Sequence, residues 1–441
     1  MEFISSFPER YQRLISNQSW PTNFGDVVAL MIGVSLASYI LVSVFTWLWR
    51  QFSFTGTAAK RFLSMGYEVA EGHLIQDDMV NRLKRYRKVE EMLPPYPNGW
   101  FLLFQSDELT KGQSTGLSVC GLNLIAWRGE SGKVHVADAY CTNSAANTSI
   151  AESEDKKEGV QCPFHGWEFE GTTGGEMPKA QTSTTEKVKK THMHHVMEQD
   201  GLVYFWFHAE DVEPEWTPRL QAAAQGKDWK LRGFVETYVN SHMQDIPENQ
   251  ADVMHFNYLH GPGYISGYEP HNNAFSFLEF VRFEYNGKWR PHEDPSKKHV
   301  AYTPDVTVDM HLFGKYTFRV VIMNVTQEGP GITCFHFAFP GLGKWASTSA
   351  WLMTTPVEPM VQKLFMPTYS GPWVPSFFVT MVFEYFVVSI ARDAAVWNRK
   401  SQLKNPILVK EDAGIKVYRG WINQFYTENS PRPDYFSSIE Y

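Results

Sequence analysis

The sequence predicts an α+β protein in three parts: an N-terminal segment with a transmembrane helix (residues 1–50), an all-β domain (98–208) and an α+β domain (219–430). Three observations lead to this prediction. An uncharged apolar run near the N-terminus is long enough to cross a bilayer. Short apolar runs between Gly-rich and Asn-rich turns indicate strands in the middle of the chain. Beyond them, strand-like and helix-like runs mix without strict βαβ alternation.

The N-terminal apolar run reads VVALMIGVSLASYILVSVFTWLW, from Val27 to Trp49, with Asp26 and Arg50 at its borders. A membrane-crossing helix needs about 20 apolar residues, and a signal peptide would have a shorter apolar core. The run therefore predicts a single-pass anchor, with a buried core helix as the alternative. The slight excess of basic residues after the run favours a main body in the cytosol, and we expect a protein of the endoplasmic reticulum membrane.

The runs GWFLLF, LNLIAW, KVHVADAY and GLVYFWF predict the strands of the all-β domain. The stretch AEDVEPEWTP (209–218) is typical of a linker, since it is rich in Pro and acidic residues. The runs TVDMHLF, YTFRVVIM and TCFHFAFP then predict strands of the second domain, and residues 245–260 form a helix-like stretch.

The composition excludes several classes of protein. Asp and Glu number 48 against 40 Lys and Arg, and the net charge of -8 argues against a nucleic-acid binder. Only four cysteines occur among 441 residues, too few for a disulfide scaffold, and this number is typical of a reducing compartment. Cys120 and Cys334 lie outside any motif and are expected to be structural thiols.

Cys141 and Cys162 lie 21 residues apart, and Cys162 opens the motif CPFHGW, which includes His165. A lone C-x-x-H is usually a buried thiol beside a surface histidine. Here the motif lies in a strand-rich region with a second Cys-containing loop. Two cysteines on one iron and two histidines on the other form a Rieske [2Fe–2S] site, so the motif predicts half of such a site.

The run DIPENQADVMHFNYLH ends in two histidines, His255 and His260. Two imidazoles and one carboxylate form the facial triad of mononuclear Fe(II) oxygenases. At about 100° per residue, Asp252 and His255 lie about 60° apart on a helix, but His255 and His260 lie about 140° apart. Both histidines can bind one metal only where the helix bends or ends, and Gly261-Pro262 is expected to supply that ending.

The chain resembles the Rieske non-haem iron oxygenases, and within them the Neverland-type cholesterol 7-desaturases. The resemblance extends over nearly the whole chain. It rests on the N-terminal anchor, PPYPNGWF (94–101), CPFHGW, IPENQADVMHFNYLH and FYTENSP (425–431). It implies a Rieske-like domain followed by a catalytic domain with a mononuclear iron.

The resemblance implies Cys141, Cys162 and His165 as cluster ligands. One position departs from the family, whose first loop reads C-x-H, because Asn143 stands where the fourth ligand is expected. An amide oxygen is a much poorer donor than imidazole for this iron. His135 could substitute, although its place in a predicted strand favours another orientation.

The resemblance also implies Asp393, in a D-x-x-x-W segment, as the carboxylate that binds iron with His255 and His260. Asp252 is expected to bridge His255 to the His165 of a neighbouring subunit and so carry electrons; the alternative is an N-cap or a surface acid. A second apolar run, Val374 to Ala391, precedes Asp393. It is expected to be a buried or membrane-resting helix, because a crossing there would separate Asp393 from His255.

The expected function is oxidation of cholesterol to 7-dehydrocholesterol by O2. The electrons come from NAD(P)H through a separate reductase, since the chain has neither a Walker A loop nor GxGxxG. The resemblance implies a membrane-bound homo-oligomer, a trimer, with a [2Fe–2S] cluster and Fe(II). The alternative is a redox-impaired sterol-binding or regulatory protein, which Asn143 favours. A third possibility is an iron enzyme that takes its electrons directly from a donor.

Overall fold

The computed structural model describes residues 24–52, 60–62, 93–142, 144–148, 158–171, 176–177, 190–219, 228–262, 280–400, 403 and 406–432. The chain divides into two compact units, Met1–Thr55 and Gly56–Tyr441. The first contains one described helix, α2 (Phe24–Phe52). The second contains all of the described strands and the other described helices.

The predicted membrane anchor requires a correction. A spanning helix must combine about 20 residues with sustained apolar character. Among the residues that the structure describes, no helix is both long enough and apolar enough to cross a membrane. The expected transmembrane helix, single-pass topology and endoplasmic reticulum membrane location are therefore wrong on this finding.

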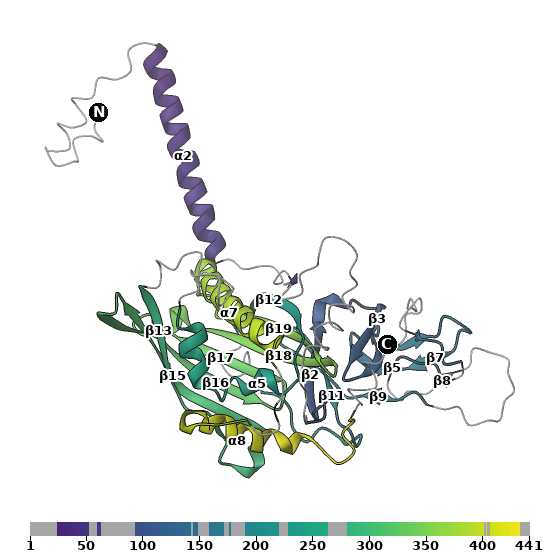
Figure 1. Ribbon diagram of the computed structural model, residues 1–441. Coiled ribbons are helices and arrows are strands. Elements are labelled where there is room, and N and C mark those ends of the chain that lie inside the picture. The colour runs from purple at the N-terminus through teal and green to yellow at the C-terminus, as the bar shows by residue number, and fades with distance from the viewer. Residues whose placement is uncertain are drawn as a thin grey trace. The chain divides into compact units, whose positions relative to one another are not determined.

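A nine-stranded sheet is the largest layer of the second unit (Figure 1). Its order is β1-β12-β19-β18-β17-β16-β15-β13, and β14 pairs with β15. Neighbours are antiparallel, except that β1 and β12 are parallel. The strands are β1 (Lys60–Phe62), β12 (Lys230–Val239), β13 (Val281–Asn286), β14 (Arg290–Pro291), β15 (Val300–Leu312), β16 (Tyr316–Glu328), β17 (Ile332–Ala338), β18 (Thr348–Glu358) and β19 (Val361–Ser370).

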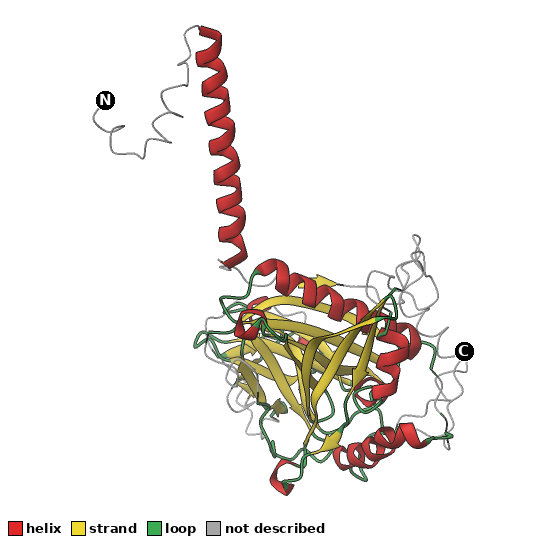
Figure 2. Ribbon diagram, turned by 90° about the vertical axis from the view of Figure 1, so that its left-hand side faces the viewer, coloured by secondary structure: helices red, strands yellow, loops and turns green. Residues whose placement is uncertain are grey.

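Helix α7 (Ser376–Trp397) lies across one face of this sheet (Figure 2). Its sequence contains no Gly or Pro, so the helix continues through Asp393. Val382, Phe386 and Ile390 are buried in the core that α7 shares with the strands. Burying such side chains contributes about 1.5–3 kcal/mol each. The second apolar run is therefore a buried helix, one of its two expected forms.

Gly233 allows this close packing. A Cβ at that position of β12 would lie 3.0 Å from the ring of Phe383, tighter than an ordinary side-chain contact. The register of β12 against β19 also shifts between Leu231 and Gly233, which marks a local irregularity. A glycine at this strand position therefore lets α7 lie close to the sheet.

Three smaller sheets contain the strands that lie between β1 and β12 in the chain. Their orders are β10-β11-β2, β3-β4-β5-β9 and β6-β7-β8. The four strand runs predicted here lie in β2, β4, β5 and β11. The strands are β2 (Gly99–Gln105), β3 (Ser114–Val119), β4 (Leu122–Arg128), β5 (Val134–Asp138), β6 (Gly159–Gln161), β7 (Glu168–Glu170), β8 (Glu176–Met177), β9 (Met193–His194), β10 (Val196–Gln199) and β11 (Leu202–Phe207).

The small sheets dock on β18 of the large sheet. Cys120 N donates to Pro356 O over 2.7 Å, and Thr355 Oγ1 donates to Leu102 O over 2.7 Å. One hydrophobic core joins residues of β2 and β11 with residues of β17, β18 and β19. The domain limits 98–208 and 219–430 stay a prediction.

The short helices between β12 and β13 carry the motif DIPENQADVMHFNYLH. They are α5 (Asp245–Glu248), α6 (Val253–His255) and the π-helical turn η4 (Phe256–His260). Near the C-terminus, α8 (Ala413–Ile422) lies beside α5, and Arg419 Nε is 2.7 Å from Glu248 Oε2. The 3-10 turns are η2 (Ser106–Glu108), η7 (Pro295–Lys297), η8 (Gly343–Ala346), η9 (Lys410–Asp412) and η10 (Asn423–Phe425).

Candidate metal centre and apolar pocket

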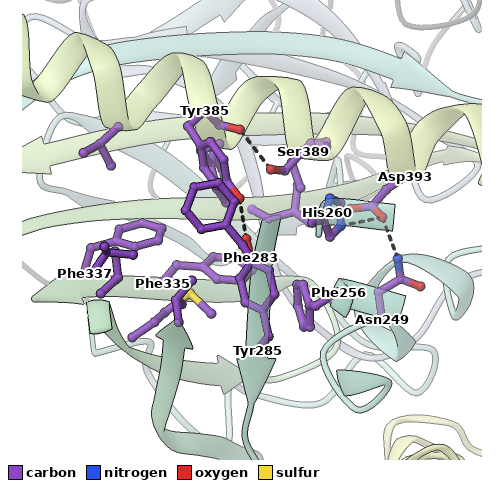
Figure 3. A pocket seen from close by; sticks show the side chains of 18 of the residues that line it. Asn249, Phe256, His260, Phe283, Tyr285, Phe335, Phe337, Tyr385, Ser389 and Asp393 are labelled. Carbon is purple, nitrogen blue, oxygen red and sulfur yellow. Dashed lines mark hydrogen bonds and ion pairs between the residues drawn. The ribbon is translucent and has the colours of Figure 1, made fainter. Parts of the chain in front are cut away.

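His255, His260 and Asp393 meet at one point of the second unit, where α6, η4 and α7 come together. The ligand-type atoms of the three side chains all lie within 4.8 Å of one another. Asp393 Oδ1 is 3.2 Å from His260 Nε2 and 3.7 Å from His255 Nε2. Figure 3 shows His260 and Asp393 facing each other, from η4 and α7 respectively. The structure thus brings together the three residues that the sequence and the resemblance single out.

The π-helical turn explains how two histidines five positions apart face the same point. In a π-helix the backbone bonds run from i to i+5, so residues with that spacing lie much closer to one side of the helix than they would in an α-helix. The His255 and His260 rings are 5.2 Å apart between centroids. The sequence predicts the bend or ending at Gly261-Pro262. The structure instead changes the helix type between the two histidines.

The imidazole nitrogens at this point are buried and available to bind a metal. His255 Nε2 and both ring nitrogens of His260 are buried and make no hydrogen bond among the described residues, although both Nε2 atoms lie at ion-pair distance from Asp393 Oδ1. Buried polar atoms normally have partners, so unpaired atoms that converge beside a carboxylate fit a cation. Burial, only partly opposed by Asp393, lowers the pKa of His255 and favours the neutral ring that binds metals. Two imidazoles and a carboxylate fit Fe(II).

Two side chains that sequence analysis missed hold the ligands in place. Asn249 Nδ2 donates to Asp393 Oδ1 over 3.3 Å (Figure 3). The Arg392 guanidinium donates to Pro262 O over 2.7 Å and to Leu259 O over 3.3 Å. Arg392 therefore ties α7 to the chain on both sides of His260. Its position directly before Asp393 was the only signal in the sequence.

Asn257 joins the π-helical turn to β13. Its Nδ2 donates to Tyr285 O over 3.1 Å, and its Oδ1 accepts from Tyr285 N over 2.7 Å. Gly261 completes the junction, because a Cβ there would lie 2.2 Å from Asn257 O. A single amide side chain thus satisfies both backbone groups of Tyr285. No sequence pattern marked Asn257, since asparagines are common in loops.

Asp252 is the N-cap of α6, and its Oδ1 accepts from His255 N over 3.2 Å. Its Oδ2 lies 3.9 Å from His255 Nδ1. The capping role considered from the sequence is therefore present, together with the expected proximity to His255. Within the described part of this chain, Asp252 makes no contact with His165.

Cys141 and Cys162 lie in facing loops, one after β5 and the other between β6 and β7. Both are buried, and the Cys162 sulfur accepts the backbone N–H groups of Phe164 and His165 beside the Cys141 thiol. Burial raises the pKa of the Cys162 thiol. Two adjacent sulfurs with N–H groups directed at one of them fit the two-cysteine half of a [2Fe–2S] cluster.

His165 is the residue predicted to provide one imidazole for the other half of the cluster. It is exposed, and its ring lies against Phe164 at a centroid distance of 4.1 Å. Asn143, at the fourth ligand position, lies outside the described residues. His135, the possible substitute, pairs with Glu158 through Nε2 at 3.1 Å and stacks on Trp127. Its strand position therefore directs it to another partner.

An apolar cavity of about 360 Å³ opens at the three metal-ligand residues. This volume lies within the usual range of small-molecule sites. The strands of the large sheet line one side of the cavity and α7 lines the other (Figure 3). Aliphatic and aromatic side chains form most of the wall, among them Phe256, Phe283, Val320, Phe335, Phe337, Phe339, Phe378 and Val382.

Comparison with known proteins agrees with this geometry. The Rieske [2Fe-2S] domain family matches residues 99–191, and the 3-ketosteroid 9alpha-hydroxylase C-terminal domain family matches residues 205–426. A cholesterol 7-desaturase from Xenopus laevis is 32% identical over 88% of this chain and 84% of its own length. One from Caenorhabditis elegans is 34% identical over 81% of this chain and 83% of its own length.

Among solved structures, dicamba monooxygenase bound to dicamba superposes with a TM-score of 0.51 and 15% identity, covering 75% of this chain and 97% of that chain. This likeness supports the fold alone. The fold and the two domain matches define a Rieske-type oxygenase, which is an oxidoreductase. Within this class the chain belongs to the family of the cholesterol 7-desaturases. The domain matches imply a [2Fe–2S] cluster and a mononuclear iron as cofactors.

Proposed function

We propose that the chain catalyses sterol 7-desaturation, the reaction for which its relatives are named, at an iron held by His255, His260 and Asp393. The observation that carries the proposal is the apolar cavity of about 360 Å³ that ends at these three side chains. A rigid, almost wholly apolar substrate suits such walls, and the buried ligand set lies where a reacting carbon would be presented. Cholesterol is the substrate proposed.

Cys141, Cys162 and His165 are the residues proposed to hold the [2Fe–2S] cluster. When bound, the two cofactors supply electron storage and the activation of dioxygen. The sequence contains no nucleotide-binding glycine loop, so a separate reductase delivers electrons from NAD(P)H. The balanced reaction takes cholesterol, O2, two electrons and two protons to 7-dehydrocholesterol and two waters.

The protein's own contribution is to position the substrate and to exclude water. Asn249 orients the Asp393 carboxylate, and burial favours the neutral form of His255. The aliphatic and aromatic walls bury the sterol rings and restrict their orientation, which keeps carbons 7 and 8 next to the ligand set. They also exclude bulk water, which would compete for the reacting site.

Asp252 is proposed to connect His255 with His165 of the partner subunit in a homo-oligomer. The Asp252 carboxylate lies 3.9 Å from His255 Nδ1, which hydrogen-bonds to the backbone oxygen of Asp252. His165 is exposed and can be reached from outside the chain. A carboxylate between two imidazoles fixes their orientation and can carry a hydrogen-bonded electron path. A trimer is the assembly that the family resemblance implies.

Product analysis with Asp393→Asn tests the proposed reaction. The purified chain, with a compatible reductase, NADPH, O2 and cholesterol, is expected to release 7-dehydrocholesterol, measured by mass spectrometry. Asp393→Asn is expected to lower the rate at least about 100-fold, since changes outside the ligand set already cost 10- to 100-fold. Binding of cholesterol should persist because the apolar walls are unchanged.

Asp211→Asn is the matched control, because Asp211 is an exposed carboxylate that pairs with His192. It should leave the rate unchanged. The family match does not favour the redox-impaired alternative. Cholesterol binding without product, under saturating reductase and with iron present, would instead establish that alternative.

A further inference from the structure

Two tyrosine hydroxyls meet inside the apolar cavity. Tyr285 extends from β13 and Tyr385 from α7, and their hydroxyl oxygens share a short hydrogen bond (Figure 3). Both side chains line the cavity, on opposite walls. Apart from the residues around the metal centre, the polar side chains of the described lining are these two tyrosines and Ser389, and Ser389 donates to the backbone oxygen of Tyr385.

The pair lies close to the metal ligands and its position is well defined. The ring of Phe256 is 5.4 Å from that of Tyr285 and 5.5 Å from that of His260, between centroids. One aromatic ring therefore separates the Tyr285 ring from an iron-ligand imidazole. Asn257 holds both backbone groups of Tyr285, and Phe283 packs edge-on against Tyr385 at 6.0 Å.

The hydroxyl pair can form a hydrogen bond with a third oxygen. Each phenol has one proton to donate and lone pairs to accept with. When Tyr385 donates to Tyr285, the Tyr285 proton is left to donate into the cavity, and lone pairs remain to accept. Burial raises the pKa of both phenols, which therefore stay protonated at neutral pH.

We propose that the Tyr285–Tyr385 pair binds the single oxygen of the substrate, the 3-hydroxyl of a sterol, and so sets which carbons face the iron. The inference rests on the proposed function and identifies the polar contact within it. A substrate with one hydroxyl and an otherwise apolar skeleton needs one buried polar partner, because an unpaired buried hydroxyl is costly. The cavity places such a partner beside the ligand set.

The arrangement also matches the shape of the sterol nucleus. The 3-hydroxyl is on ring A, and carbons 7 and 8 are in the adjacent ring B. A short separation between the hydroxyl partner and the metal ligands is therefore required, and a single intervening aromatic ring provides it. The remaining rings and the hydrocarbon tail would lie along the apolar wall formed by Phe335, Phe337 and Phe339.

Binding of three ligands to the purified full chain tests the proposal: cholesterol, cholest-5-ene, which lacks the hydroxyl, and cholest-4-en-3-one, whose oxygen only accepts. The wild type is expected to bind cholesterol about 10-fold more tightly than cholest-5-ene, the size of one net hydrogen bond. The ketone should keep most of the affinity, since the Tyr285 proton donates to it. Tyr285→Phe, which removes the donor, should reduce the cholesterol preference to about twofold or less. Tyr385→Phe, which removes the partner that orients the Tyr285 hydroxyl, should also reduce the preference, but by less.

Tyr316→Phe, an exposed tyrosine on β16, is the matched control and should keep the 10-fold preference. If the tyrosine pair only braces β13 against α7, both variants will lower the melting temperature while the cholesterol-to-cholestene ratio stays at its wild-type value; that result overturns the inference and leaves the proposed function intact. Absence of sterol binding by the wild type would instead overturn the proposed function itself. Binding is measured directly, so the outcome does not depend on turnover.

Discussion

At the scale of single residues, the proposed iron site depends on Arg392 as well as on its ligands. Arg392 is 4% exposed, and its guanidinium holds carbonyls on both sides of His260. It neighbours Asp393 in α7, so one side chain fixes the distance between two ligand-bearing segments. A planar guanidinium can bond two carbonyls in fixed directions, which an ammonium group cannot reproduce.

Arg392→Lys is therefore expected to weaken iron binding about 10-fold, at the low end of the range for residues outside the ligand set. The measurement is iron affinity by competition with a chelator, followed by metal analysis. Arg399→Lys is the control, since Arg399 lies just after α7, is exposed, and its guanidinium donates to Ala395 O of α7. Equal affinities for wild type and Arg392→Lys would show that the carbonyl contacts do not position His260.

At the scale of elements, the π-helical turn determines whether the two histidines can act together. Five residues, Phe256–His260, adopt the wider helix and bring His260 round to the side of His255. In an α-helix the same spacing would separate the side chains by about 140°. The turn ends at Gly261, whose carbonyl accepts from Phe283 N over 2.7 Å, so β13 holds the turn from outside.

Insertion of one alanine between Tyr258 and Leu259 should rotate His260 away and lower the iron content at least about 10-fold. Tyr258 is 78% exposed, so the insertion itself displaces no core side chain. A matched insertion between Gly314 and Lys315, in the exposed turn after β15, should keep full iron content. Deletion of Tyr258 from the wild type places the histidines four positions apart. Because an α-helix brings residues with that spacing to one side, this deletion should retain more iron than the insertion does. Iron retained by the first insertion would contradict this account.

At the scale of the whole second unit, Glu328 joins the segment before β12 to the large sheet. It ends β16, is buried, and its Oε2 accepts from Arg219 N over 2.6 Å. Burial raises the pKa of Glu328 to about 7, although the bond from Arg219 opposes the shift. An unfolded glutamate titrates near 4.3, so the folded chain holds this proton more tightly.

The free energy of unfolding should therefore fall as pH rises from about 4.5 to about 7. Above about pH 7, Glu328 should cause no further loss of stability. Glu328→Gln keeps an acceptor for Arg219 N but cannot ionise. Relative to wild type, it should gain up to about 3 kcal/mol in the free energy of unfolding between pH 5 and pH 8. Urea denaturation at both pH values measures the gain, with the exposed Glu293→Gln as control. If the free energies of unfolding of wild type and Glu328→Gln differ by the same amount at both pH values, the raised pKa of Glu328 is refuted.

Features of the fold and of the candidate site that depend on residues close together in the sequence could be predicted. Features that depend on contacts between distant residues could not. Local patterns predicted β2, β4, β5 and β11 and three strands of the large sheet, β15, β16 and β17. The facial-triad motif, together with the family resemblance, predicted which histidines would converge. The tyrosine pair and the Arg392 contacts join residues 100 to 133 positions apart, so no local pattern could indicate them. The prediction of a membrane anchor was wrong, because the uncharged apolar run alone was taken as sufficient evidence for a membrane-spanning helix.

Helix α7 has a consequence for the order in which the molecule is made. His255 and His260 leave the ribosome on the order of ten seconds before Asp393, given usual synthesis rates. Until α7 exists and packs on the sheet, the growing chain presents the two imidazoles without the Asp393 carboxylate, and a facial triad requires all three groups. The complete candidate site therefore arises only when α7 packs on the large sheet, which places metal loading late in biogenesis.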